Sequence, residues 1–357
     1  MRPAFSYSLI IVSTLAIIYL GLNYSDLNRT VKEQAASVYR LNDDSSQPAE
    51  IYISLMDIIN ASLERIRNAM TIVSTSTVQS SVDERLPTST TDLADAIVNI
   101  LCAYETNQYR RTVSGTGFMI SKEGAILTNA HVAQFLLLVD NESVKKASCD
   151  VRVNNESRDT YSAGLLYISP TWIIKHADII ASQEPRGSGE NDFALLYLSD
   201  LNKEAPAFPF IPVSVDHLTS QMIGRAVILV GYPSSEEVSA REGYSRKIAT
   251  TTISNIYTFG SGSADVLSLN ESVLGYSGAS GGPVIDNLGK AIGVISTKDE
   301  GTTKLNAITT TYINRRMREE TGFDLKSTIQ GNLSARAKLF NETVSPILGE
   351  LLNQSLR

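Results

Sequence analysis

The chain has 357 residues, 43% of them hydrophobic and 19% charged, which are ordinary proportions for a globular protein with room for one large domain and additional segments. Its net charge of −7 argues against a nucleic-acid-binding protein, which needs a basic face. Three scattered His and two Cys do not suggest a zinc site, and we predict neither a metal nor a cofactor.

An uncharged, mainly apolar run extends from Ala4 to Leu22. At about 1.5 Å per residue, a helix of this length matches a bilayer core. No small-residue cleavage site follows it clearly, which favours a retained transmembrane signal anchor over 1–24 rather than a cleaved signal peptide. Basic residues on both sides of the run, Arg2 before it and Arg29 and Lys32 after it, leave its orientation open.

Residues 25–91 are predicted to be a helical stalk with polar linkers at 42–48 and 74–91. Within 51–73, apolar residues recur at the spacing of a helical stripe: Leu55, Ile59, Leu63, Ile66, Met70 and Val73. This stripe either packs on the rest of the chain or joins subunits into a homo-oligomer.

Each of the two cysteines lies in a predicted strand of the following region. Cys102 ends the apolar segment 97–102, and Cys149 lies in 147–153. They either pair across neighbouring strands or remain buried free thiols. In an oxidising compartment, closing so long a loop would add about 4 kcal/mol by the chain-entropy estimate.

His131 follows two predicted strands, 114–120 and 125–128, that are joined by a turn. A histidine at a strand end can present one nitrogen to a serine and the other to a carboxylate. The alternative is a partly buried structural histidine. His176 and His217 have polar or loop-like surroundings and are predicted to lie at the surface.

Asp192 begins the apolar strand 192–198 and is the candidate for that carboxylate. Asp178 competes with it but has no long strand behind it. The region before the Asp192 strand, 154–190, contains Trp172 and is interpreted as an insertion that either forms a packed surface loop or covers a cleft.

Ser280 lies in a turn of small residues, Gly278-Ala279-Ser280-Gly281-Gly282-Pro283. Such a turn can expose a hydroxyl nucleophile beside backbone N–H groups that stabilise an oxyanion. The alternative for this turn by itself is a plain hairpin. The histidine and aspartate segments that precede it favour the catalytic interpretation.

Together, these segments make the chain resemble a trypsin-like serine peptidase, closer to the bacterial Deg/Htr branch than to the digestive enzymes. The order His, Asp, Ser matches that family. So do four stretches: 128–132, 192–196, 278–283 and 291–296. The resemblance implies an all-β core over 92–326, made of two packed six-stranded antiparallel barrels at 92–205 and 206–326. A C-terminal helical segment, 327–357, would break near Pro346 and cover the second barrel.

By position, the resemblance makes Ser280 the nucleophile and His131 the general base and then acid, with Asp192 orienting the imidazole. The backbone N–H groups of Gly278 and Ser280 would form the oxyanion hole. Ser296 would lie beside the triad and line the substrate channel. One pocket wall would be formed by 274–277, starting at Leu274.

The other pocket wall would comprise Ser296, Thr297 and Lys298. Leu274 stands where trypsin has an acidic residue, so we expect a small or medium apolar residue before the cut rather than Lys or Arg. Lys298 either attracts an acidic side chain or is simply an exposed residue at the rim.

Three departures from the family pattern stand out. Ala279 replaces the aspartate that pairs with a newly cut N-terminus in digestive members, so zymogen cleavage of that kind should not be needed. Val132 replaces their cysteine. No segment of ordinary domain size follows the protease region, where Deg/Htr proteins commonly have a PDZ domain.

The sequence therefore predicts a membrane-anchored serine endopeptidase whose catalytic domain lies outside the cytoplasm and acts on polypeptides. One alternative is a catalytically silent protease-like domain that binds peptides or protein partners. Another is an esterase on the same scaffold.

Overall fold

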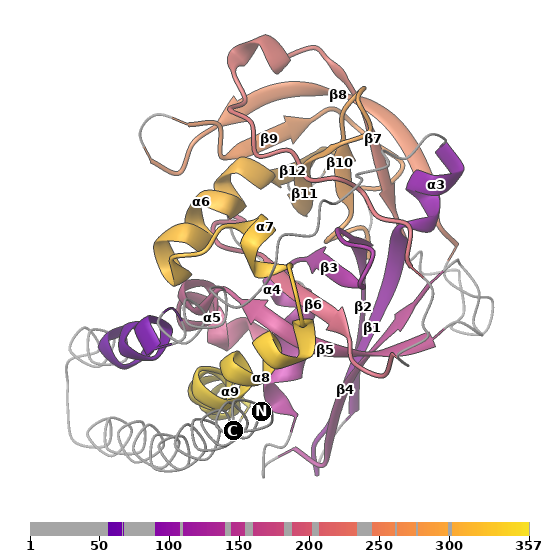
Figure 1. The fold of residues 1–357 in the computed structure, drawn as a ribbon. Coiled ribbons are helices and arrows are strands. Elements are labelled where there is room, and N and C mark those ends of the chain that lie inside the picture. Colours follow the sequence, from indigo (N-terminus) through magenta and orange to yellow (C-terminus); the bar gives the residue numbers. More distant parts are fainter. Residues whose placement is uncertain are drawn as a thin grey trace, which may run out of the picture.

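The computed structural model describes residues 56–65, 67, 90–107, 110–139, 144–153, 160–181, 188–201, 207–233, 245–260, 263–275, 278–298 and 302–356. Two closed antiparallel barrels form its centre (Figure 1). The prediction of two six-stranded barrels is thereby confirmed. Within the described residues, no helix is both long and apolar enough to cross a bilayer. The run Ala4–Leu22 lies outside them.

The first barrel closes in the order β1-β2-β3-β6-β5-β4. Its strands are β1 (Ile97–Glu105), β2 (Arg110–Met119), β3 (Ala125–Thr128), β4 (Lys146–Arg152), β5 (Thr160–Ile168) and β6 (Ala194–Leu198). The second barrel closes in the order β10-β11-β12-β9-β8-β7. Its strands are β7 (Ala226–Gly231), β8 (Lys247–Tyr257), β9 (Val266–Leu269), β10 (Pro283–Ile285), β11 (Ala291–Lys298) and β12 (Leu305–Thr309).

Short helices connect and cover the barrels. They are α3 (Thr90–Asp95), α4 (Ala130–Ala133), α5 (Pro170–His176), α6 (Thr310–Thr321), α7 (Leu325–Thr328), α8 (Leu333–Thr343) and α9 (Ser345–Ser355), with the 3₁₀ helices η1 (Gln134–Leu138), η2 (Ala177–Ala181) and η3 (Ser220–Met222). The cap of α6 follows from its sequence, because the Thr309 side chain accepts a hydrogen bond from the N–H of Tyr312 and Gly322 ends the helix in a left-handed conformation.

Residues 154–190 are not an insertion. They include β5, which pairs with β4 and β6 and is needed to close the first barrel. The side chain of Trp172, in α5, belongs to the core of this half of the molecule. The strand at 160–168 has no clear pattern of alternating apolar residues at its start, and without it the segment resembles a long loop.

The C-terminal helices cover the first barrel, so the expectation that they cover the second was wrong. Helix α8 packs on β5, and α9 packs on η1, η2 and α5 (Figure 1). The amide of Asn341 donates to the Leu165 carbonyl at 3.0 Å, which fixes α8 on the strand. Helix α9 begins at Ser345 with Pro346 in its first turn, where proline costs no hydrogen bond.

The described part of the predicted stalk packs on the same chain. Residues 56–65 are helical, and Ile59 and Leu63 of the apolar stripe are buried in the large hydrophobic cluster that includes the first-barrel strands and the helices that cover them. Arg67 donates from Nε to the Thr321 carbonyl at the end of α6, at 3.2 Å. The other residues of the stripe lie outside the described side chains, so a homo-oligomer through 51–73 stays a prediction.

Cys102 and Cys149 face each other across the antiparallel pair β1–β4 and form a disulfide. The bridge closes a loop with a sequence separation of 47. By the chain-entropy estimate, replacing both cysteines by alanine should lower the free energy of unfolding by about 4 kcal/mol. Urea denaturation of the two forms measures this difference. Thiol labelling of both cysteines in the unreduced, unfolded protein would show instead that the bridge does not form.

Candidate active site

His131 and Asp192 come from the same end of neighbouring strands. His131 lies in α4, shortly after β3, and Asp192 precedes β6, with Thr128 and Ala194 paired in the antiparallel register. The His131 backbone N–H donates to Asp192 Oδ1 at 3.0 Å, and His131 Nδ1 lies 2.8 Å from Asp192 Oδ2. A hydrogen on Nδ1 leaves Nε2 of the neutral ring as an acceptor, which is the form a general base requires.

The second barrel also contacts the Asp192 carboxylate. Ser296 of β11 donates its hydroxyl to Oδ2 at 2.7 Å. Burial alone would raise the pKa of the Asp192 carboxyl, but the charge and hydrogen bonds of His131 and the hydrogen bond of Ser296 hold that pKa below its ordinary value. Asp192 therefore remains ionised beside the imidazole, although only 3% of the residue is exposed.

Ser280 lies on a turn that both barrels hold. The N–H of Thr116, in β2, donates to the Ser280 carbonyl at 2.8 Å, and the N–H of Gly281 donates to the Ile295 carbonyl of β11 at 2.8 Å. Gly281 has φ = 89°, and a Cβ atom there would overlap the Thr116 carbonyl oxygen. Glycine is therefore required at this position. The Ser280 side chain itself is only half-buried.

The hydrogen bonds between described residues include none from the Ser280 hydroxyl to the His131 ring. They also include no chain acceptor for the N–H groups of Gly278 and Ser280. Serine–histidine contacts in ligand-free proteases are often long and shorten only when substrate binds.

One predicted pocket residue, Leu274, does not lie at the surface. Leu274 has no exposed surface and belongs to the core of the second barrel, so its side chain does not line a substrate wall as expected. Thr297 and Lys298 continue β11 beyond Ser296, with the Lys298 side chain exposed. Asp178, the competing carboxylate, is exposed in η2, apart from His131. Among the described residues, no cluster of three or more His, Cys, Asp or Glu could hold a metal ion.

Thr116 was missed as a site residue. Its buried hydroxyl donates to the Gly278 carbonyl at 2.7 Å and accepts from the N–H of Tyr232, at the end of β7, at 2.9 Å. Its carbonyl accepts from the Thr128 hydroxyl at 2.7 Å. Thr116 thus connects the first barrel to the nucleophile turn. No sequence pattern marked Thr116, because its complete burial is known only from the structure.

Replacing Thr116 by Val should lower the free energy of unfolding by roughly 2 kcal/mol, because a buried carbonyl and a buried N–H each lose their partner. Thr116→Ser keeps the hydroxyl and should lose less. Urea denaturation followed by the fluorescence of Trp172, the single tryptophan, measures both variants. Equal losses in the two variants would show that the methyl group, not the hydroxyl, is responsible.

The sequence model of the trypsin-like peptidase domain family matches residues 115–294. This span covers half of the chain and contains His131, Asp192 and Ser280. The chain belongs to this family. As a trypsin-like peptidase domain, it has its three candidate residues in the family's order, two of them before β6 in the first barrel and Ser280 before β10 in the second.

Two further proteins are similar to this trypsin-like chain. The uncharacterised protein y4bJ of Sinorhizobium fredii is 25% identical over 236 residues, which are 66% of this chain and 28% of that protein. The chain thus spans little more than a quarter of that relative's length. The crystal structure of the serine endoprotease from Yersinia pestis is 21% identical, with a TM-score of 0.42, over 67% of this chain and 68% of the other.

Proposed function

We propose that this trypsin-like domain is a serine endopeptidase, with Ser280 as nucleophile, His131 as general base and acid, and Asp192 as the carboxylate that orients the imidazole. The observation that carries the proposal is the buried His131–Asp192 pair, joined at both carboxylate oxygens at 3.0 and 2.8 Å. A half-buried serine lies on a glycine turn that the strands of both barrels hold.

In the proposed reaction, Ser280 Oγ attacks the carbonyl carbon of the peptide bond while His131 Nε2 takes its proton. The negative charge moves to the carbonyl oxygen, where the N–H groups of Gly278 and Ser280 donate to it. When the C–N bond breaks, His131 gives its proton to the departing amine and an ester on Ser280 remains. Water then attacks that ester, with His131 again taking and returning the proton.

Asp192 acts throughout on the imidazole. Its carboxylate keeps hydrogen on Nδ1 and stabilises the positive ring that forms in both steps. Since the pKa of Asp192 is held below its ordinary value, the carboxylate does not take the proton itself near neutral pH. Ser296 supports this role by donating to the same oxygen that faces the ring.

Cleavage of an unfolded polypeptide tests the proposal. Wild-type protein should convert an unstructured protein such as casein into peptides with new N-termini, and Ser280→Ala should not. Binding of the polypeptide without cleavage would favour a silent peptide-binding domain. Cleavage of activated esters but of no peptide bond would favour an esterase.

We also propose that the apolar run Ala4–Leu22 anchors the chain in a membrane, with the barrels outside the cytoplasm. The length of the run and the Cys102–Cys149 bridge, of a kind that persists in oxidising compartments, support this placement. The full chain should stay with membranes during carbonate extraction. Added protease should digest the barrels while the cytoplasmic membrane is intact. Release by carbonate would contradict an anchor.

A further inference from the structure

The residue before Asp192 has an unusual backbone conformation. Asn191 has φ = 61° and is the one non-glycine residue with positive φ among those described. Asparagine tolerates this left-handed region better than most residues. The N–H of Phe193 donates to the Asn191 carbonyl at 2.9 Å, and the N–H of Asp192 donates to Gly189 at 3.1 Å. The rotation at Asn191 therefore decides where the Asp192 carboxylate points.

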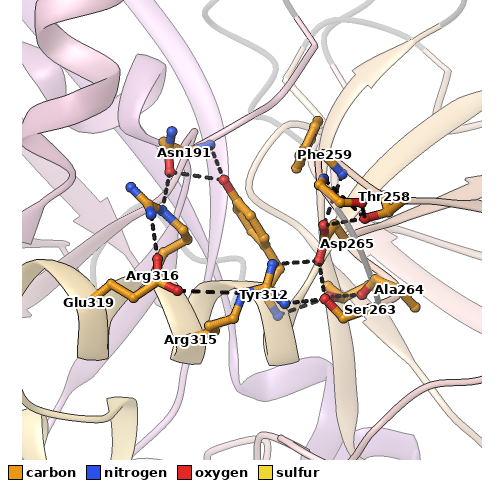
Figure 2. A network of polar contacts seen from close by, with 12 residues as sticks. Asn191, Thr258, Phe259, Ser263, Ala264, Asp265, Tyr312, Arg315, Arg316 and Glu319 are labelled. Atoms are coloured by element: carbon orange, nitrogen blue, oxygen red, sulfur yellow. Dashed lines mark hydrogen bonds and ion pairs between the residues drawn. The ribbon is translucent and has the colours of Figure 1, made fainter.

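Helix α6, which follows the second barrel, holds Asn191 at three points (Figure 2). The Tyr312 hydroxyl donates to Asn191 Oδ1 at 2.9 Å and accepts from the Asn191 N–H at 3.2 Å. Arg316 Nε donates to the same Oδ1 at 2.8 Å. Asn191 is 1% exposed and Tyr312 2%, so the two hydrogen bonds between them form away from water, where hydrogen bonds are strongest.

The two α6 residues are themselves fixed. Arg316 donates to Glu320 Oε1 at 3.2 Å and pairs with Glu319. The Glu320 carboxylate accepts hydrogen bonds from three hydroxyl groups of β5 and the residues that follow it: Tyr167, Ser169 at 3.0 Å and Thr171 at 2.9 Å. The ring of Tyr312 packs on Phe259 with centroids 5.1 Å apart. Helix α6 is thus connected to both barrels when it contacts the turn before Asp192.

We propose that Asn191, Tyr312 and Arg316 are positioning residues for Asp192, and that α6 through them sets the orientation of the His131 ring. The proposal rests on the peptidase function proposed above. A left-handed turn alone would need only glycine at 191. The side-chain amide adds two contacts, from Tyr312 and Arg316, to the backbone contact with Tyr312, and together they prevent the turn from rotating. A shift of Asp192 by about 1 Å would break one of its two contacts to His131, and such displacements can lower catalysis about 100-fold.

The first experiment observes the histidine directly. The chain has three His, so ¹⁵N-histidine labelling gives three imidazoles, and His131→Gln assigns one of them. The Nδ1 hydrogen that faces Asp192 should give a far-downfield proton resonance in the wild type. In Tyr312→Phe, which removes only the hydroxyl, and in Asn191→Gly, which keeps the backbone conformation, this resonance should broaden or disappear. Tyr257→Phe, which removes an exposed tyrosine hydroxyl of β8, should leave it unchanged.

The second experiment measures turnover of a peptide substrate. Tyr312→Phe and Asn191→Gly should each lower kcat about ten-fold with KM nearly unchanged, since orientation of the base and not substrate binding is affected. Because both variants remove the hydrogen bond from Tyr312 to Asn191 Oδ1, the double variant should lose less than the two single losses combined. Additive losses in the double variant, or a changed KM with kcat kept, would overturn the positioning role.

The two readouts separate this inference from the proposed function. If no peptide is cleaved even by the wild type, the downfield resonance still decides whether α6 positions Asp192. An unchanged resonance in both Tyr312→Phe and Asn191→Gly would overturn the inference while leaving the peptidase proposal intact. If one variant fails to fold, the other gives the result alone.

Discussion

Ser280→Ala should abolish covalent labelling by a fluorophosphonate and lower kcat by about 10⁴-fold or more. The reagent phosphonylates a serine oxygen that an adjacent base activates, and an alanine methyl group offers no such atom. The turn should keep its shape, because its backbone contacts to Thr116 and Ile295 do not involve the Ser280 side chain. Labelling is measured by intact mass, as one adduct per chain.

The matched control is Ser254→Ala, which removes an exposed serine of β8. This variant should label like the wild type. Equal labelling of Ser280→Ala and the wild type would place the nucleophile elsewhere. Absence of labelling in the wild type would favour a silent domain, or a resting state in which the Ser280 hydroxyl and the His131 ring remain apart.

Local patterns in the sequence were sufficient for much of the barrel architecture. The strand predicted at 125–128 is β3 with the same bounds, because three apolar residues and a threonine between the turn at Gly124 and the polar Asn129 leave few alternatives. The segment 192–198 contains β6, whose apolar side chains are buried. The order His, Asp, Ser then indicated the family, and the family resemblance predicted the two barrels.

Position along the chain misled the prediction about the C-terminal helices. Since 327–357 directly follows the second barrel, it was placed there, but α7 and the turn after it return the chain to the first barrel. The buried side of α8 presents Phe340 to Tyr167 of β5, with ring centroids 5.5 Å apart. An apolar helix face indicates that a partner exists, but it does not say which of two apolar surfaces is covered.

Apart from the His131–Asp192 pair, hydrogen bonds between distant residues were not predicted. Thr116 meets Gly278 across 162 positions, and Asn191 meets Tyr312 across 121. Each contact joins a common polar residue to a backbone carbonyl or another polar side chain, which gives no pattern in a single sequence. The same limit applies to Leu274: its residue type suited a pocket wall and a core equally, and burial in the second barrel decided between them.

Asp192→Asn should lower kcat by about 10⁴-fold while KM and the fold are kept, as expected for loss of the orienting carboxylate in a serine–histidine–aspartate triad. The amide NH₂ would donate where the carboxylate accepts, so the imidazole would carry its hydrogen on Nε2 and could not take the Ser280 proton. Asp178→Asn, at an exposed position of η2, should stay within two-fold of the wild type. Peptide hydrolysis under saturating substrate measures both. The reverse order of effects would assign the orienting role to Asp178 and would remove the basis for any positioning by Asn191.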